Sequence, residues 1–346
     1  MKDLYKIGLL FITLVLLLAC KKSEDSDKIA PTNLNVIADV SDDGSGAVSF
    51  TATADNAVSF DYEFGNGDIQ TATSGNVVYK YTQIGTITYN VTVTAKSSYN
   101  LKVKKTIQIT VTVNEATLTL YWSDEFNIDG VPDPTKWGYD LGGGGWGNAE
   151  LQYYTSRSEN AIVQQGVLKI KAIKENYVSG YDYTSARLLS KGKFDFKYGK
   201  VEVRAKLPAG VGTWPAVWML GSDISTVGWP SCGEIDIMEH KGSDLNRIYG
   251  TLHYPGRSGG NADGSSKYIS NATTEFHTYS VDWSASYIKI YVDDQLYHTV
   301  INSASIPFNH NFFLIMNLAM GGTFGGSVDP SFTNATLEVD YIRVYK

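Results

Sequence analysis

Cysteine and histidine are scarce in this chain of 346 residues, which contains two Cys and five His. Two cysteines exclude the dense disulfide framework of a small secreted scaffold, and no spacing of Cys and His matches a zinc site. Sustained helical periodicity is absent as well, which excludes a helical fold. Only one long apolar run occurs, from Ile7 to Ala19, and it is shorter than the roughly 20 residues that span a bilayer.

Positive charge is in deficit, since 29 Lys and Arg oppose 36 Asp and Glu and leave a net charge of −7. This balance argues against nucleic acid and strongly anionic polysaccharides as partners. The chain is rich instead in Gly (33 residues), in Tyr (23 residues) and in runs of Thr and Val, which are typical of an all-β protein with many turns. Its length is comfortable for two domains.

The N-terminus is typical of a targeting segment rather than of a folded element. Lys2 and Lys6 precede the apolar run, which ends in Leu17-Leu18-Ala19-Cys20. This ending looks like a bacterial lipobox, so residues 1–19 are interpreted as a lipoprotein signal peptide and Cys20 as the lipidated first residue of the mature protein. The alternative is a simple secretory signal with an incidental cysteine. A lipidated Cys20 would leave Cys232 without a disulfide partner.

Residues 20–30 are polar and charged, which predicts a flexible tether. Their acidic cluster Glu24-Asp25-Ser26-Asp27 resembles the surface-export tags of lipoproteins in some Gram-negative bacteria. The expected location is therefore the bacterial outer membrane, with the lipid anchor holding the protein at the cell surface or on the periplasmic face.

Residues 31–113 show short alternating strands, such as Val48 to Thr53 and Thr88 to Thr94. The run from Tyr62 to Gly67, followed by Tyr79-Lys80-Tyr81, resembles the immunoglobulin-like β-sandwich of polycystic-kidney-disease (PKD) domains. The usual motif has tryptophan and aspartates where this chain has Tyr, Glu and Asn. The module is interpreted as a spacer, with a sugar-binding module as the alternative, and the second domain is expected over 118–346.

Three carboxylates occur within six residues of a strand-like run, at Glu234, Asp236 and Glu239. In a regular strand Glu234 and Asp236 share one face, and Glu239 points to the other. A β-bulge around Ile237 and Met238 would return Glu239 to the face of the other two acids. The pattern therefore predicts three acids on one surface, with a solvated acidic face as the alternative.

The predicted bulge leaves four effective strand steps between the two glutamates, or roughly 13 Å between their Cα atoms. On a concave sheet the side chains can lean together until the carboxyls are about 5 to 6 Å apart. That is the separation of a retaining glycosidase, in which one carboxylate is the nucleophile and the other is the acid/base.

Tryptophan is concentrated just before these acids, at Trp214, Trp218 and Trp229. Indole faces suit the apolar C–H faces of sugar rings, although aromatic clusters also form cores. Trp214 and Trp218 are four residues apart, so they share a face if the segment is a strand. Acids and indoles together indicate a sugar cleft.

The chain resembles the family 16 glycoside hydrolases, and most closely their bacterial laminarinases, which are endo-β-1,3-glucanases. The resemblance rests on the acidic run and on these stretches: 122–126, 146–154, 185–187, 197–202, 251–254, 276–279, 317–322 and 339–345. It implies that Glu234 is the nucleophile, Glu239 the acid/base and Asp236 the residue that orients the nucleophile. It also implies a concanavalin A-like jelly roll of two curved antiparallel sheets, with the cleft on the concave face.

Further residues are candidates for substrate binding. Arg187 carries several donors that could fix sugar hydroxyls, and His253 could hydrogen-bond the substrate or the acid/base. Asn148, Glu150 and Gln152 alternate to one face beside the glycine loop 142–145, which lacks the ending of a phosphate-binding loop and is interpreted as a cleft rim.

No cofactor is expected for catalysis. The resemblance implies a structural calcium ion away from the catalytic face, with Glu125, the carbonyl of Gly166 and Asp340 as the matching positions. The expected substrate is a neutral β-1,3-glucan, and the expected state is a monomer. Two alternatives stay open: a family 16 enzyme for another polymer, such as mixed-linkage glucan, agarose, porphyran or carrageenan, and a non-catalytic sugar-binding lipoprotein.

Overall fold

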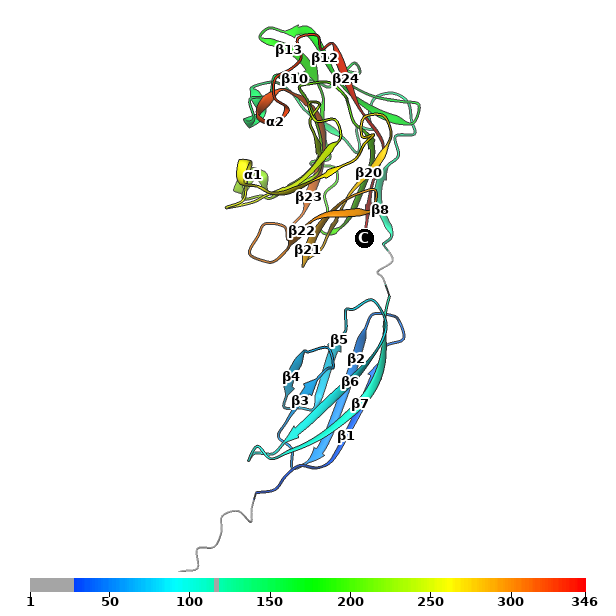
Figure 1. The fold of residues 1–346 in the computed structure, drawn as a ribbon, viewed down its shortest axis with the longest axis vertical. Coiled ribbons are helices and arrows are strands. Elements are labelled where there is room, and N and C mark those ends of the chain that lie inside the picture. The colour runs from blue at the N-terminus through cyan, green and yellow to red at the C-terminus, as the bar shows by residue number, and fades with distance from the viewer. Residues whose placement is uncertain (1–27, 115–117) are drawn as a thin grey trace, which may run out of the picture. The chain divides into compact units, whose positions relative to one another are not determined.

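The computed structural model describes residues 28–114 and 118–346, which form two compact units with Leu118 as the first residue of the second (Figure 1). The predicted signal peptide and Cys20 lie outside the described residues. None of the helices in the described part of the chain has the length and apolar character that a membrane span needs.

The first unit is a β-sandwich of one three-stranded and one four-stranded sheet, in the orders β1-β2-β5 and β4-β3-β6-β7. Its strands are β1 (Thr32–Val40), β2 (Ala47–Asp55), β3 (Ser59–Glu63), β4 (Ile69–Ala72), β5 (Asn76–Lys80), β6 (Gly85–Lys96) and β7 (Lys102–Val113).

The aromatic signature of the first unit lies in its core. Tyr62, Phe64 and Tyr81 are buried between the sheets. The Tyr81 hydroxyl donates to the Phe64 carbonyl at 2.9 Å, which satisfies a polar group that burial would otherwise leave unpaired. Gly65 has a φ of +82°, and a Cβ there would lie 2.7 Å from the carbonyl oxygen of Asn90, so this turn requires glycine.

The second unit packs a ten-stranded sheet against a seven-stranded one, and both curve strongly (Figure 1). The ten-stranded sheet has the order β10-β13-β12-β24-β15-β20-β21-β22, with β11 paired to β12 and β8 paired to β24. Its strands are β8 (Leu120–Asp124), β10 (Gln152–Tyr154), β11 (Ala161–Gln164), β12 (Val167–Val178), β13 (Tyr181–Ser185), β15 (Gly199–Lys206), β20 (His277–Trp283), β21 (Tyr287–Val292), β22 (Gln295–Ile301) and β24 (Asn334–Tyr345).

The seven-stranded sheet has the order β19-β18-β17-β16-β23-β14-β9. Its strands are β9 (Gly138–Asp140), β14 (Arg187–Leu189), β16 (Thr213–Gly221), β17 (Glu234–His240), β18 (Arg247–His253), β19 (Asp263–Tyr268) and β23 (Phe312–Met320). Within residues 28–114 and 118–346, helical structure is limited to short turns, which are η2 (Gly145–Gly147), α1 (Ile224–Val227), η3 (Gly259–Asn261) and α2 (Gly322–Gly325).

Period-two burial explains why these residues form sheets. In β15, Val201, Val203 and Ala205 are fully buried, and the residues between them are partly exposed. In β23 every residue is buried, because one face packs in the core and the other is enclosed as well. The predicted all-β jelly roll is thus confirmed for the second unit.

Candidate active site

The seven-stranded sheet carries a cleft of about 830 Å³. The short helices contribute to its rim through Ile224 of α1 and Phe324 of α2. Of the residues predicted as catalytic or substrate-binding, all but Gln152 line this cleft: Asn148, Glu150, Arg187, Trp214, Trp218, Trp229, Glu234, Asp236, Glu239 and His253. The fold therefore brings together residues that are more than 100 positions apart in the sequence.

The predicted bulge is present in the acid-bearing strand β17. Against β18, Asp236 pairs with Thr251 and Glu239 pairs with Tyr249, so β17 has one more residue than its partner between these pairs. The pairing with β16 shifts at the same place. Ile237 and Met238 are buried, and all three acids reach the cleft, as a bulge requires.

The separation of the two glutamates along the strand also agrees with the prediction. Glu234 pairs with Leu220 of β16, and Glu239 pairs with Ala216. These partners are four residues apart in a strand without an insertion, which corresponds to roughly 13 Å. The distance between the two carboxyl groups stays a prediction.

Indole groups hold both glutamates. The Nε1 of Trp229 donates to Glu234 Oε2 at 2.9 Å, and the Nε1 of Trp214 donates to Glu239 Oε1 at 3.0 Å. The Thr251 hydroxyl lies 3.3 Å from the other oxygen of Glu239. These donors fix the carboxyl groups and favour their ionised forms.

His253 lies against Asp236 and Glu234 rather than against Glu239. Its Nε2 is 3.2 Å from Asp236 Oδ2 and 3.7 Å from Glu234 Oε1, while its Nδ1 accepts the backbone N–H of Gly259 at 3.1 Å. Because Nδ1 accepts, the neutral imidazole carries its proton on Nε2 and presents a donor to the acids.

Glu234, Asp236 and His253 could also ligate a cation, since one ligand atom from each lies within 4.8 Å of the others. The tautomer argues against this use. A histidine binds a metal through a lone pair, and the Nε2 facing the acids is the protonated nitrogen.

Burial raises the pKa of each acid. Burial and then the charge of Asp236 raise the pKa of Glu234 well above its ordinary value. Burial and then Glu239 do the same to the pKa of Asp236. Burial also raises the pKa of Glu239, against the hydrogen bond from Trp214. Carboxyl groups this close disfavour one another's ionised forms.

Arg187 packs against two indole rings of the cleft wall. Its guanidinium carbon is 4.9 Å from the ring centre of Trp146 and 4.8 Å from that of Trp218, and its Nε is 3.0 Å from Asp140. The Nε1 of Trp218 donates to Asn317 at 2.8 Å. This stack is a rigid flat wall of the kind that receives a sugar ring.

Asn148 and Glu150 line the cleft, but Gln152 does not. Gln152 is fully buried: its amide donates to Glu150 Oε2 at 2.7 Å and accepts the backbone N–H of Met320 at 2.8 Å. The prediction that Gln152 contacts substrate is therefore corrected, because the bridge to Glu150 and β23 draws this side chain inward. It positions Glu150, which also accepts from Asn148 at 3.1 Å.

Several lining residues were not predicted, among them Trp146, Thr251, Asn317 and Phe324. Trp146, directly after the glycine loop, has a φ of 49°, a conformation that local sequence does not reveal. Thr251 and Asn317 reach the cleft only through the pairing of β18 and β23 with their neighbours. Their one signal in the sequence was their place within the stretches that resemble the family.

The three positions expected for calcium lie on or next to neighbouring strands of the ten-stranded sheet. Glu125 directly follows β8 and Gly166 directly precedes β12, and both strands pair with β24, which contains Asp340. Arg343 donates to both oxygens of Glu125 at 3.0 and 2.7 Å and holds the pKa of this acid below its ordinary value. Asp340 is paired with Arg204. Calcium binding at these positions stays a prediction, and a cation would have to compete with these two arginines.

Known proteins resemble the second unit closely. Residues 148–343 match the model of the glycosyl hydrolases family 16. The chain is 49% identical over 244 residues to a beta-glucanase of Rhodothermus marinus, a match that covers 66% of this chain and 85% of that protein. It is 40% identical over 248 residues to a glucan endo-1,3-beta-glucosidase of Cryptopygus antarcticus, covering 65% of this chain and 90% of that protein.

A solved structure agrees. The X-ray structure of the laminarinase from Rhodothermus marinus aligns with a TM-score of 0.64 and 48% identity, over 66% of this chain and 97% of that one. The family model covers more than half of the chain and includes the acidic strand β17. This chain belongs to the glycosyl hydrolases family 16.

Proposed function

We propose that the protein is a retaining endo-β-1,3-glucanase. The observation that carries the proposal is the bulged strand β17, which places Glu234, Asp236 and Glu239 together in a tryptophan-lined cleft. Two carboxyl groups on one face of a sugar cleft are what double displacement requires. The curated relatives named above act on β-glucans, which supports the substrate.

In the first step, protonated Glu239 gives its proton to the glycosidic oxygen while ionised Glu234 attacks the anomeric carbon. The bond to the leaving sugar breaks, and a covalent glycosyl ester forms on Glu234. In the second step Glu239, now ionised, takes a proton from water, which attacks the same carbon and releases Glu234.

The contacts of each acid support these roles. Glu234 accepts the indole N–H of Trp229 and lies 3.7 Å from the Nε2 of His253, and these two groups favour its charged form as nucleophile. Burial raises the pKa of Glu239, which favours the protonated form that an acid catalyst needs. The choice of Glu234 as nucleophile and Glu239 as acid/base follows the resemblance to the family.

The cleft composition supports a neutral polymer cut internally. Its walls are indole rings and amides, with the charge of Arg187 balanced by Asp140. Helices α1 and α2 line the cleft and have only one turn each. We propose that such short rims leave the cleft open at both ends, as internal cleavage of a polymer requires.

Proton NMR of the first products from laminarin, lichenan and agarose tests the proposal. We expect β-anomers of short β-1,3-linked glucans to appear first from laminarin. First-formed α-anomers would contradict retention, and preference for lichenan or agarose would contradict the substrate. A protein that binds laminarin without cleaving it would favour a sugar-binding role.

We further propose a structural Ca²⁺ at the junction of Glu125, Gly166 and Asp340. Carboxylate and carbonyl oxygens are the donors that Ca²⁺ prefers, and Glu125 and Gly166 adjoin strands that pair with β24, which carries Asp340. The ion would tie β8 and β12 to β24 and take no part in hydrolysis. Melting temperature should rise on adding Ca²⁺ to chelator-treated protein, and Asp340→Asn should abolish the rise. An unchanged melting temperature in the parent protein would contradict the site.

The remaining proposals concern the rest of the chain. We infer that the first unit is a PKD-type spacer, since its signature aromatics form a core and few of its acids cluster. Residues 1–19 are proposed to be a lipoprotein signal peptide and Cys20 the anchor of a monomeric protein at the outer membrane. The support is the sequence Leu17-Leu18-Ala19-Cys20 after a short apolar run.

A further inference from the structure

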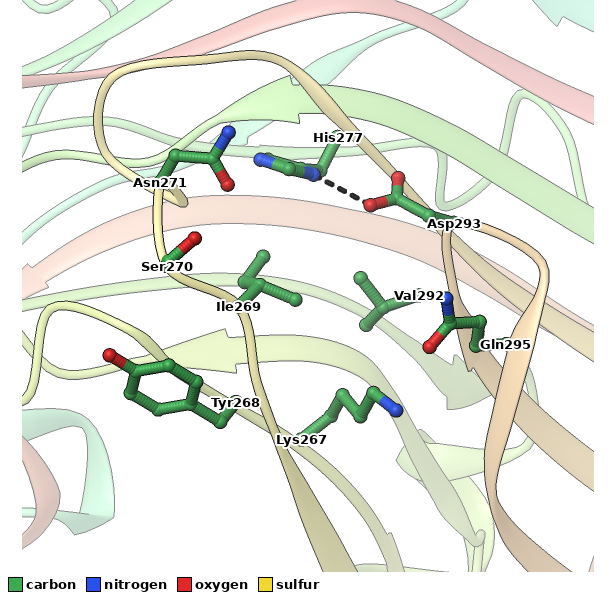
Figure 2. A pocket seen from close by; sticks show the side chains of 9 residues that line it. All are labelled: Lys267, Tyr268, Ile269, Ser270, Asn271, His277, Val292, Asp293 and Gln295. Carbon is green, nitrogen blue, oxygen red and sulfur yellow. Dashed lines mark hydrogen bonds and ion pairs between the residues drawn. The ribbon is translucent and has the colours of Figure 1, made fainter.

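A second pocket, of about 320 Å³, lies at the edge of the seven-stranded sheet (Figure 2). We call it the edge pocket. It is formed by the end of β19, by the segment that follows it and by the turn between β21 and β22. Its size is at the small end of the range of about 300 to 1,000 Å³ that ligand pockets occupy. It shares no lining residue with the cleft.

The edge pocket is close to the cleft in the sheet. Glu239 pairs with Tyr249, which pairs with Ser266 of β19, the residue before Lys267 in the pocket wall. Two strand spacings correspond to roughly 10 Å between the Cα atoms of Glu239 and Ser266. Ser266 shares the cleft face with Glu239, whereas Lys267 in the pocket wall points to the other face of β19. A polysaccharide that occupies both sites therefore has to pass around this edge strand.

The walls of the edge pocket are held by hydrogen bonds. His277 Nδ1 lies 2.7 Å from Asp293 Oδ2, and the other oxygen of Asp293 accepts the backbone N–H of Thr278 at 3.0 Å (Figure 2). In the segment after β19, the backbone carbonyl of Asn271 accepts two backbone N–H groups. The side-chain amide of Asn271 donates to Glu275 at 2.7 Å. A site held in this way binds without a large cost of ordering.

The chemistry of the edge pocket matches a sugar ring. Ile269 and Val292 face each other as an apolar floor, and Ser270, Asn271 and Gln295 supply hydroxyl and amide groups around it (Figure 2). A pyranose ring has an apolar C–H face and a rim of hydroxyls that both donate and accept. The amide and hydroxyl side chains also do both.

Charge and exposure favour the same ligand. Lys267 and Asp293 contribute one charge of each sign, so the pocket has no net attraction for an ion. Tyr268 beside it is 61% exposed and offers a ring face to a chain passing over the pocket. One nitrogen of the His277 ring is buried without a partner, which leaves a polar atom that a hydroxyl could satisfy.

We propose that the edge pocket is a second sugar-binding site, which takes one glucosyl unit of a polysaccharide chain. The choice of glucose rests on the proposed function. By binding the polymer at a second point, the pocket raises the effective concentration of substrate at the cleft without taking part in the reaction.

The test is a double variant, Tyr268→Ala with Gln295→Ala, in which both altered side chains are exposed. We expect its kcat/KM on laminarin to fall by about threefold to tenfold, the scale of one lost stacking or hydrogen-bonding contact. Its kcat/KM on a β-1,3-linked glucotetraose, too short to occupy both sites firmly, should equal that of the parent. Tyr177→Ala, which removes an exposed tyrosine from another edge of the unit, is the control and should leave both values unchanged.

Binding without hydrolysis provides a second measurement. In the Glu234→Gln background, the double variant should be retarded less than the Tyr177→Ala control in a gel that contains laminarin. Equal retardation, together with equal kcat/KM on laminarin, would overturn the edge-pocket proposal. Failure of the proposed function is distinguishable from failure of the edge-pocket proposal, because the wild-type protein itself would then leave laminarin uncut. If it cleaves lichenan instead, the same comparison in lichenan gels decides the pocket.

Discussion

Asp236 lies between the two glutamates on β17, and its carboxylate contacts the Nε2 of His253. Its side chain is almost fully buried, and its pKa is raised by burial and by Glu239. A buried acid of this kind destabilises the folded protein wherever it must be ionised. The residue is therefore one that function retains at a cost in stability.

Asp236→Asn should melt at a higher temperature than the parent at pH 7, by about 2 to 6 °C, as expected for roughly 1 to 2 kcal/mol in a domain of this size. The folded pKa is raised, so the acid favours folding only below its ordinary value of 3.8 and opposes it as pH rises above that value. The gain in melting temperature should therefore vanish near pH 3 in calorimetric scans. The kcat of Asp236→Asn on laminarin should be about 10²-fold lower than that of the parent. Asp182→Asn, at an exposed position of β13, is the control; a variant no more stable than this control at pH 7 would contradict the argument.

His253 should influence the acid side of the pH profile. Its Nε2–H helps to hold the pKa of Glu234 down against burial and Asp236. In His253→Leu the pKa of Glu234 should rise, so the acid limb of kcat/KM should move to higher pH by roughly half a unit to one unit. His253→Gln keeps a donor and should restore much of the parental profile. His310→Gln, outside the cleft, is the control, and an unmoved acid limb in His253→Leu would show that the histidine only fills space.

At the residue scale, the sequence predicted the acids well and their surroundings in part. Glu234, Asp236 and Glu239 are adjacent on one strand, so alternation and one bulge were enough to place them. The position of Trp146 in the cleft depends on its own left-handed backbone conformation, and that of Asn317 depends on the pairing of β23 with β16. Both are properties of the folded sheet and not of the local sequence. Gln152 was predicted to share a face with Glu150, and it does contact Glu150. The hydrogen bonds to Glu150 and Met320 that bury it could not be predicted from spacing.

The bulge in β17 is the element on which the site depends. Without the extra residue, the run would read Glu-Ile-Asp-Ile-Glu, and regular alternation alone would keep all three acids on one face. The bulge thus adds a residue between the glutamates without adding a strand step or changing which face they use. What it alters is the local twist and the aim of Glu239.

Deletion of Met238 should therefore be tolerated better than insertion of an alanine after it. The deletion restores regular pairing and displaces Glu239 by a fraction of a residue, so we expect kcat/KM to fall by about 10²-fold, as for a displacement of about 1 Å. The insertion demands a wider bulge or turns Glu239 into the core, and its activity should fall to that of Glu239→Gln. Reducing-sugar assays on laminarin measure both, with folding checked by circular dichroism; equal activities would refute the geometric argument.

Long strands were easier to predict than short ones. β15, β12 and β24 are eight residues or more in length and contain runs of alternating burial, so the sequence reveals their buried faces. β9 and β14 have three residues each and gain their pairing only from neighbours that are distant in sequence. The enclosed strand β23 is a continuous apolar run apart from Asn317, so its type follows from context rather than from period.

At the scale of the whole molecule, the two units have separate cores. The buried clusters of residues 28–114 and of 118–346 share no member, and the cleft is lined by the second unit alone. The cleft is therefore assigned to the second unit. The sequence predicted the boundary at residues 112–117, because the resemblance to the family 16 enzymes begins near Leu118, and Leu118 is the first residue of the second compact unit.

A protein that begins at Leu118 should fold and keep its activity on soluble oligosaccharides. Its core and its acids are complete, and the first strand, β8, still pairs with β24. We expect kcat/KM on a β-1,3-linked glucotetraose within about twofold of the full chain, because no group that contacts substrate is removed. A large loss with an unchanged circular dichroism spectrum would show that the first unit contributes to the cleft.

The lipid anchor is the last whole-molecule prediction. A single apolar run too short to span a bilayer, followed by cysteine, predicts that attachment depends on acyl chains carried by Cys20. Cys20→Ser should move the protein from the membrane fraction to the soluble fraction of cells while its activity on laminarin is unchanged, since the cleft is built entirely from the second unit. Cys232→Ser, which alters the buried free cysteine near the cleft, is the matched control and should remain with the membrane. A Cys20→Ser protein that stays membrane-bound as efficiently as the parent would show that another segment provides the attachment.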